Sequence, residues 1–513
     1  MQLLLNKLGN LITGADIQNR GRVITAFLAL NCLMASYYFI KPLRKGLFFS
    51  EFSADWLPYF HLGVISFVLI ITALITFLTK FCEYRKLIRI FFSLVLLINL
   101  MFMFLVGNPN KLIVASFSIW ASSYFPLCVA LFWGGINQNF TCKSSKQSYA
   151  FIWIGAILGA YLGSQVTSIS MRIYGSSWND EYQLILSIIL LILTIVSLEK
   201  FFSMTPKEEL DRPSFNHNSG MHSIEKAKKD GLFSLLTEIF RNPYVRNIAI
   251  IVLCLTFSRG VFDLQSDHII ENQISTKMFQ KHFLVVNSKY DEKFILSENN
   301  FDFVHNYKSL GKSDRQALFE QIVSAEESSF TFEQYKELYQ KYLNDMKNEI
   351  ILFNSDVWSY QNVISLVLLL ICKFRFINVF GLMGLLLLLP LTYLTVFLFF
   401  ATHINLQIIF VLKVATLSLD YSLNNAAKEI LYVPLDERAN TCFKPVIEGP
   451  LFKIGASSAS AIRILFDQIL HLFSYGKFLN IAFILTGIAV VLRWIASTMD
   501  ISERFKSIDQ KSQ

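Results

Sequence analysis

Three cations interrupt an apolar stretch near the start of the sequence. The segment SYYFIKPLRKGLFFSEF (residues 36–52) places Lys41, Arg44 and Lys45 after an apolar run that begins at Val23, and apolar residues resume directly behind them. A cation at the centre of a bilayer costs about 2.5–3.5 kcal/mol even on the insertion scale, so three on one lipid-facing helix are unfavourable. We therefore predict that Lys41 and Arg44 line an interior site for an anion.

The neighbours of these cations favour the same interpretation. Tyr37 and Tyr38 are amphipathic aromatic residues, and Pro42 is expected to break the helix. Aromatic residues, a helix break and cations together suit a water-filled cavity. The alternative is a membrane boundary with snorkelling side chains, because the apolar run 23–40 is barely long enough to span the membrane alone.

Other ionisable residues fall at comparable depth. Asp263 lies in the seventh predicted span, Lys413 and Asp420 in the tenth, and Glu448 in the eleventh. Lys413 and Asp420 are seven residues apart, which places them two turns apart on one helix face. Carboxylates near cations inside a membrane are candidates for coupling or gating, and a static ion pair is the alternative for each.

The elements that position these residues are predicted from composition. The chain has 513 residues, of which 53% are hydrophobic and only 16% are charged. Repeated apolar runs of 18 or more residues are typical of membrane-spanning helices. The sequence predicts an all-α polytopic membrane protein with twelve spans, at residues 23–46, 57–80, 88–107, 112–137, 149–170, 183–202, 247–264, 356–373, 377–400, 405–424, 447–472 and 478–497.

The twelve spans divide into two halves of six. Residues 1–202 form the first half, a basic connector covers 203–246, and residues 247–513 form the second half. The second half contains a polar insertion at 265–354, between spans seven and eight. Within it, residues 331–350 have a capping-box spacing and an amphipathic pattern, so we predict a small helical insertion outside the membrane.

Stripes of small residues occur at matching positions in both halves. Gly155, Gly159 and Gly163 share one face of span five, and GASSASA (residues 455–461) lies in span eleven. Small residues allow membrane helices to approach closely. Either stripe alone indicates ordinary tight packing, but both together favour a major-facilitator-like architecture with rocking halves.

Orientation follows from the short loops. Basic residues gather at 80–89, 143–146, 373–375 and 438–444, and the loops on the opposite side carry few cations. The positive-inside rule then predicts cytoplasmic termini and an outward-facing insertion. We expect the membrane to be the inner (cell) membrane of a bacterium.

The sequence does not favour catalysis. It contains no HExxH, GxSxG, Walker A or strand-associated GxGxxG motif, and its eight His residues are spread out. We predict no enzymatic activity, no cofactor or metal site and no nucleic-acid partner. Nucleotide binding in a transport cavity is compatible with these absences.

Four segments carry a resemblance to a known family. KEILYVPLDE (428–437) resembles the signature that follows span ten in the nucleotide (ATP/ADP) translocases of intracellular bacteria and plastids. Three further segments are similar in register: YYFIKPLRKGLF (37–48), LFWGGINQ (131–138) and NPYVRNIAIIVL (242–253). The similarity covers most of the chain except the connector and the insertion.

The resemblance implies a major-facilitator fold that moves nucleotides, by ATP/ADP exchange or by proton-coupled import. It also implies roles for residues that match the family motifs. Arg44, Lys146 and Lys444 would contact phosphates, and Asp263 and Glu448 would take part in coupling or gating.

This chain departs from the family pattern at three positions. Cys442 and Ala456 stand where translocases usually have Lys, and Asp267 replaces a Lys downstream of the acid in span seven. Each departure removes positive charge from a site for a polyanion.

The sequence thus predicts a secondary active transporter that moves nucleotides by alternating access. Its partners would be a small anionic substrate and the lipid bilayer. One alternative is a transporter of another organic anion or an amphipathic solute. The other is a transporter-fold receptor or scaffold that acts through residues 265–354 and a periplasmic partner.

Overall fold

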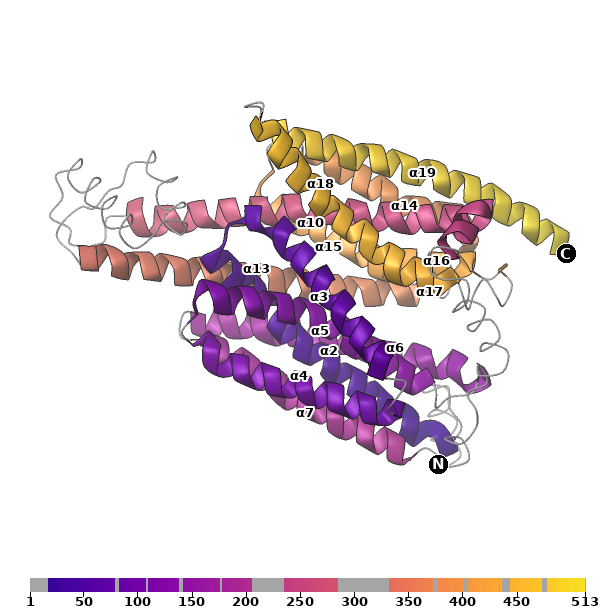
Figure 1. Cartoon of the computed structure of the whole chain (residues 1–513), viewed down its shortest axis with the longest axis horizontal. Coiled ribbons are helices and arrows are strands. Elements are labelled where there is room, and N and C mark those ends of the chain that lie inside the picture. The colour runs from indigo at the N-terminus through magenta and orange to yellow at the C-terminus, as the bar shows by residue number, and fades with distance from the viewer. Residues whose placement is uncertain are drawn as a thin grey trace.

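The computed structural model describes residues 17–78, 83–107, 109–137, 142–175, 178–204, 235–284, 332–371, 377–400, 404–432, 434–435, 443–472 and 478–512. These residues are helical apart from short connections (Figure 1). The first six long helices are α2 (Ile17–Glu51), α3 (Leu57–Leu78), α4 (Tyr84–Val106), α5 (Lys111–Asn137), α6 (Cys142–Tyr174) and α7 (Asp180–Ser203). The others are α10 (Pro243–Phe279), α13 (Phe332–Ile371), α14 (Ile377–Phe399), α15 (Leu406–Leu419), α16 (Asn425–Leu431), α17 (Lys444–Val446), α18 (Phe452–Leu472) and α19 (Leu479–Ser512).

The helices have the length and composition of a membrane protein. Within the described ranges, ten helical segments are long and apolar enough to cross a membrane. The prediction of an all-helical membrane protein is confirmed. Each of the twelve predicted spans also falls on a helix, although α13 and α18 are not among the ten.

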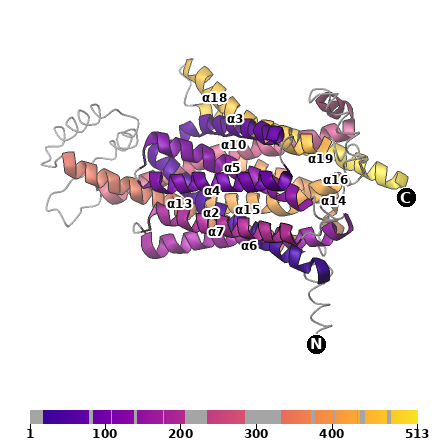
Figure 2. The same cartoon turned by 60° about the horizontal axis from the view of Figure 1, so that its bottom comes forward.

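Buried apolar side chains form two main clusters. One joins α2 to α7, and the other joins helices from α10 to α19. The two sets of helices contact each other along pairs such as α6 with α13 and α3 with α18. Figure 2 shows α3 and α18 side by side on one face of the bundle, where His61 Nδ1 lies 3.2 Å from Ser460 Oγ.

The glycine stripe of α6 packs directly on the backbone of α2. A Cβ atom at Gly155 would lie 2.8 Å from the Phe27 carbonyl oxygen, and one at Gly163 would lie 2.6 Å from that of Ala35. The stripe in α18 packs on α10 in the same way, since a Cβ at Gly455 would lie 2.9 Å from the Leu253 carbonyl oxygen. These close approaches explain why both stripes consist of small residues.

Helix α2 is continuous through Pro42, so the predicted helix break is wrong. Proline removes the hydrogen bond to the carbonyl four residues earlier, here that of Tyr38, and usually kinks a helix. Here α2 packs along α6 and α7, and Gly46, beyond the proline, lies against Lys347 and Ile351 of α13. This packing holds α2 in one element.

We call the end of the bundle where α2 ends and α7 begins the Glu51 end. Helices α10 and α13 extend beyond the other helices there (Figure 1). The 40 residues of α13 span about 60 Å, against about 30 Å for the hydrocarbon layer. A π-helical turn, Gln280–Leu284, prolongs α10.

These extensions correct the predicted limits of the insertion. The helix predicted to end at residue 264 continues without interruption to Phe279. The amphipathic segment 331–350 is helical from Phe332, as predicted, but it is the first part of α13 rather than a separate element. Residues 285–331 lie outside the described residues. The apolar run of α10 ends where polar residues begin, but the helix itself continues. It can do so because the polar parts of α10 and α13 pair with each other beyond the lipid.

Candidate functional site

Helix α2 presents its three cations to the second set of helices. Lys41, Arg44 and Lys45 are three and four residues apart, so they share one helix face. The Lys45 side chain is only 15% exposed and pairs with Asp267 of α10. The snorkelling alternative therefore does not hold for Lys45, whose charge is satisfied inside the bundle.

Asp267 joins three helices through one carboxylate. The Lys45 ammonium donates to both of its oxygens at 2.7 Å. The Lys413 ammonium of α15 donates to Oδ1 at 3.0 Å. The Asp267 and Lys413 side chains are 6% and 4% exposed, so two buried cations share one buried anion. Charge-assisted hydrogen bonds of this kind are the strong ones in proteins.

Arg259 of α10 is the centre of a second group of contacts. Its guanidinium lies 3.2 Å from Asp420 Oδ2 and donates to the Tyr421 hydroxyl at 2.8 Å. Asp263, one turn along α10, lies 3.9 Å away. Asp420 and Tyr421 belong to a π-helical turn, Asp420–Asn424, that continues α15. Such turns often occur at functional sites because they redirect side chains.

Lys41 lies among aromatic rings. Its ammonium is 4.0 Å from the ring centroid of Trp358 on α13 and 4.7 Å from that of Tyr38. A cation over an aromatic face is attracted by the ring quadrupole, and the ring carries no net negative charge to pair with it. The ring of Tyr37, next to Tyr38 in the sequence, stacks on that of Phe125 of α5 with 3.7 Å between their centroids.

Arg44 points toward a small cavity of about 50 Å³ next to Asp267. Its guanidinium donates to the Ser122 hydroxyl of α5, which is a neutral partner. Lys45, His61 and Ser118 line the same cavity. Arg44 therefore faces the boundary between the two sets of helices.

Together these residues form what we call the central charge cluster: Lys41, Arg44, Lys45, Arg259, Asp263, Asp267, Lys413 and Asp420. It contains five cations and three carboxylates, an excess of two positive charges. Five of its members, Lys41, Arg44, Asp263, Lys413 and Asp420, are sequence-predicted site residues. Contacts across α2, α10, α13 and α15 bring the cluster together.

Two other predicted residues lie in a separate cluster. Lys444 pairs with Glu429 at 2.6 Å, and Glu448 pairs with Lys428 at 3.1 Å. These residues belong to α16, α17 and the π-helical turn Ile447–Leu451 that leads into α18. The eighth predicted residue, Lys146, falls in α6, but its side chain lies outside the described part of the structure.

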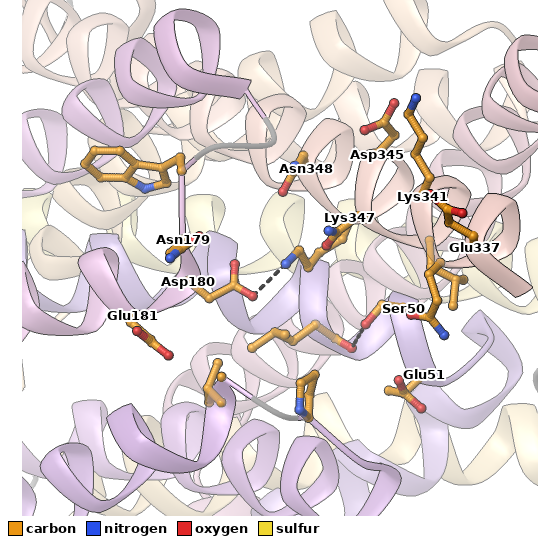
Figure 3. A pocket seen from close by; sticks show the side chains of 18 residues that line it. Ser50, Glu51, Asn179, Asp180, Glu181, Glu337, Lys341, Asp345, Lys347 and Asn348 are labelled. Atoms are coloured by element: carbon orange, nitrogen blue, oxygen red, sulfur yellow. Dashed lines mark hydrogen bonds and ion pairs between the residues drawn. The ribbon is translucent and has the colours of Figure 1, made fainter. Parts of the chain in front are cut away.

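A larger cavity of about 930 Å³ lies at the Glu51 end (Figure 3). The end of α2, the start of α7 and the first turns of α13 line it, and none of the predicted site residues does. The Lys347 ammonium of α13 lies 2.6 Å from Asp180 of α7 across this cavity, as Figure 3 shows. The cavity is thus crossed by an ion pair between the two sets of helices.

The extension of α13 is tied to that of α10 by ion pairs. Asp345 lies 2.8 Å from Lys281 and 3.0 Å from His282, and Lys277 pairs with Glu349. Burial alone would raise the pKa of Asp345. The hydrogen bonds and charges of Lys281 and His282 outweigh burial and lower this pKa below its ordinary value. Asp345 is therefore a carboxylate at neutral pH.

Sequence reasoning missed part of the cluster. The sequence marks Asp267 only as a departure from the family pattern, because it lies three residues beyond the predicted end of span seven. The signal was its spacing, since Arg259, Asp263 and Asp267 recur every four residues on one face. Trp358 carried no such signal, because an aromatic residue in an apolar run is usually a packing residue.

A family model described as "TLC ATP/ADP transporter" matches residues 115–287 and 343–505, more than half of the chain. The chain belongs to the TLC ATP/ADP transporter family. The predicted resemblance is confirmed, and the protein is a membrane transporter rather than an enzyme. A comparison with curated proteins finds no match.

Two solved structures are similar to this transporter in fold. A bacterial homologue of the human lysosomal transporter Spinster, inward-facing and occupied, matches with a TM-score of 0.50 at 10% identity, covering 95% of this chain and 97% of that one. A POT family transporter in complex with a thioalcohol-conjugated peptide matches with a TM-score of 0.50 at 11% identity, covering 93% and 96%. The transporter has a major-facilitator-like fold.

Proposed function

We propose that this transporter moves nucleotides by alternating access and that Lys41 and Arg44 of the central charge cluster bind the phosphate groups. One observation carries the proposal. Within the described ranges, no carboxylate pairs with Lys41 or Arg44, whereas Lys45, Arg259 and Lys413 all have carboxylate partners. Lys41 contacts aromatic rings and Arg44 contacts a hydroxyl, and neither kind of contact neutralises a cation. Both side chains therefore remain available to bind an anion.

The architecture that supports this proposal is a pair of six-helix halves, residues 1–202 and 247–513. We infer twelve membrane spans, with α13 and α18 crossing the membrane alongside the ten apolar segments. α13 packs on α2 and α6, and α18 packs on α3 and α10, so each charged helix is shielded by neighbours. Polar residues are tolerated in spans that face a bundle interior.

We further propose an inner-membrane location in a bacterium with cytoplasmic termini, as the basic loops favour. The Glu51 end would then face the periplasm, and residues 285–331 would lie beyond it. Polar contacts between the two halves include those of Lys45, Asp180 and Ala54, which lie toward this end. An inward-facing state, closed on the periplasmic side, fits this distribution.

Coupling would use the carboxylates of the cluster. Asp263 lies 3.9 Å from both Arg259 and Lys413, so it is shared between two cations. Bound phosphate would compete with Asp263 and Asp420 for these cations. A ligand shifts the equilibrium between the inward-facing and outward-facing states only if it binds them with different affinities. Replacement of the carboxylates by phosphate as partners of Arg259 and Lys413 would supply that difference. Lys444 and Glu448 would act at the opposite end, in their own cluster.

Uptake into intact bacteria that express the protein tests the proposal. Radiolabelled ATP, ADP and AMP would be supplied to cells with the wild type, with Arg44→Ala and with the matched variant Arg89→Ala. Arg89 pairs with Glu199 on the exposed surface, far from the central contacts. We expect saturable uptake that falls roughly ten- to a hundredfold in Arg44→Ala and is unchanged in Arg89→Ala. Correctly inserted protein without nucleotide uptake would contradict the proposal.

A receptor or scaffold acting through the insertion is a second candidate. The observation in its favour is the pair of extensions, since ion pairs brace α10 against α13 beyond the other helices. Replacing residues 285–331 with a short Gly/Ser linker separates the two functions. A transporter keeps nucleotide uptake in that variant, whereas a scaffold loses its activity and tolerates Arg44→Ala.

A further inference from the structure

The ion pairs of the central charge cluster divide its cations into two groups. Lys45 and Lys413 share Asp267, and Arg259 is held by Asp420 with Asp263 nearby. The three carboxylates thus neutralise three cations. Lys41 and Arg44 remain, and their contacts with Trp358 and Ser122 cancel no charge.

One further cation lies near the cluster. Lys453 of α18 is partly buried and close enough to Arg259 to be repelled by it. With Lys453 included, the unneutralised charge rises from two to three. An interior site of low dielectric constant penalises any uncompensated charge, whether it belongs to the protein or to the ligand. The ligand that fits best is therefore the one whose negative charge matches this excess.

We propose that the central charge cluster selects nucleotides with two or three negative charges, which are nucleoside mono- and diphosphates, over nucleoside triphosphates. The inference rests on the proposed function. A phosphate monoester carries about two negative charges at pH 7, and each further phosphoryl group adds about one. Without magnesium, ATP therefore exceeds the excess positive charge of the cluster, whereas AMP and ADP match it.

Asp267 sets this preference. Its carboxylate lies deep in the cluster and occupies two cations that would otherwise face the substrate. Asp267→Asn removes one negative charge, keeps a side chain of similar size, and releases Lys45 and Lys413. The excess positive charge rises by one, so the preference should move toward the more highly charged nucleotide.

Uptake into proteoliposomes measures this preference. The full-length protein would be reconstituted, and initial rates for labelled AMP, ADP, ATP and adenosine would be taken in magnesium-free buffer with EDTA. We expect the wild type to take up AMP or ADP faster than ATP, and adenosine least. Asp267→Asn should raise the ratio of the ATP rate to the AMP rate about tenfold, the size of one medium-range charge interaction.

Three further variants keep the test sharp. Asp267→Glu retains the charge and should leave the ratio near that of the wild type. Lys41→Gln removes a positive charge and should lower the ratio. Glu199→Gln, which changes a carboxylate paired with Arg85 and Arg89 at the surface, should leave both rates and ratio unchanged. Because each ratio is taken within one preparation, differences in the amount of folded protein cancel.

The outcomes separate the inference from the proposed function. Uptake of ATP that equals or exceeds that of AMP and ADP in the wild type overturns the inference and leaves nucleotide transport standing. A ratio that Asp267→Asn and Lys41→Gln do not move in opposite directions also overturns it. No nucleotide uptake by folded wild-type protein overturns the proposed function itself.

Discussion

The Lys45 ammonium of α2 lies 2.7 Å from both carboxylate oxygens of Asp267 on α10. The pair joins the first six helices to the second set, because α2 is one of the first six helices and α10 is the first of the second set. Its position toward the Glu51 end makes it part of the contact between the two sets of helices there. The same carboxylate also holds Lys413 of α15, so movement of α2 away from α10 would leave Asp267 with one cation instead of two.

The ion pair between Lys347 and Asp180 should also hold the Glu51 end closed. Both side chains are mostly buried, and removing one partner of a buried pair costs about 3–5 kcal/mol because the other charge is left uncompensated. We expect Lys347→Glu to open this end, which would appear as faster amide hydrogen exchange in the first turns of α7. The charge swap Lys347→Asp together with Asp180→Lys should restore slow exchange. Equal exchange in all three proteins would show that the pair does not close the bundle.

The close packing of α6 on α2 gives a prediction for stability. A Cβ at Gly159 would overlap the Asn31 carbonyl oxygen, so Gly159→Ala should force the helices apart and destabilise the protein by roughly 1–3 kcal/mol. Gly63→Ala is the matched control, because its Cβ would lie 3.5 Å from Ile119, an ordinary contact. Thermal unfolding of the purified protein in detergent should show a lower Tm for Gly159→Ala alone. A similar Tm for both variants would mean that α2 can move aside.

The sequence predicted helices well and their limits poorly, for a physical reason. Apolar runs reveal helices in lipid, so each predicted span falls on a helix. The runs stop where the lipid stops, whereas α10 continues for more than ten residues because Lys277 and Lys281 pair with the neighbouring extension of α13. Asp267 lies in that transition. A residue beyond a predicted span end is expected to lie outside the site, yet the Asp267 carboxylate pairs with two cations of the cluster.

The sequence could predict which charged residues form the candidate site, but it could not predict which of them pair with each other. Isolated cations in apolar runs are visible in a sequence, and Lys41, Arg44, Lys413, Asp263 and Asp420 indeed meet in one cluster. Which cation pairs with which carboxylate depends on helix packing. Lys413 and Asp420, two turns apart on one helix, pair with Asp267 and Arg259 of α10 instead of with each other.

The extensions of α10 and α13 should come apart in acid. The pKa of Asp345 is lowered in the folded protein, so its ion pairs contribute stability above its unfolded pKa of about 3.9 and lose it as the pH falls through the lower folded value. We expect hydrogen exchange in the first turns of α13 to quicken below about pH 4. Asp345→Asn should exchange quickly already at pH 7 and respond less to acid. An extension that is equally protected in both proteins at neutral pH would contradict this role.

Trp358 should control how Lys41 meets its substrate. The Lys41 ammonium lies 4.0 Å from the Trp358 ring centroid, and the two residues come from opposite halves. A cation over an aromatic face gains about 0.5–2 kcal/mol, so the ring holds the ammonium at the boundary between α2 and α13 without neutralising it.

Trp358→Ala should free the lysine side chain and weaken nucleotide uptake mainly through a higher KM, by roughly three- to thirtyfold. Trp358→Phe retains an aromatic face and should recover most of the loss. Tyr360→Ala is the control on the same helix, since Tyr360 is 56% exposed. Uptake assays on the three variants would decide the matter: equal KM values for Trp358→Ala and Trp358→Phe would contradict this role, because an aromatic ring would then contribute nothing that alanine lacks.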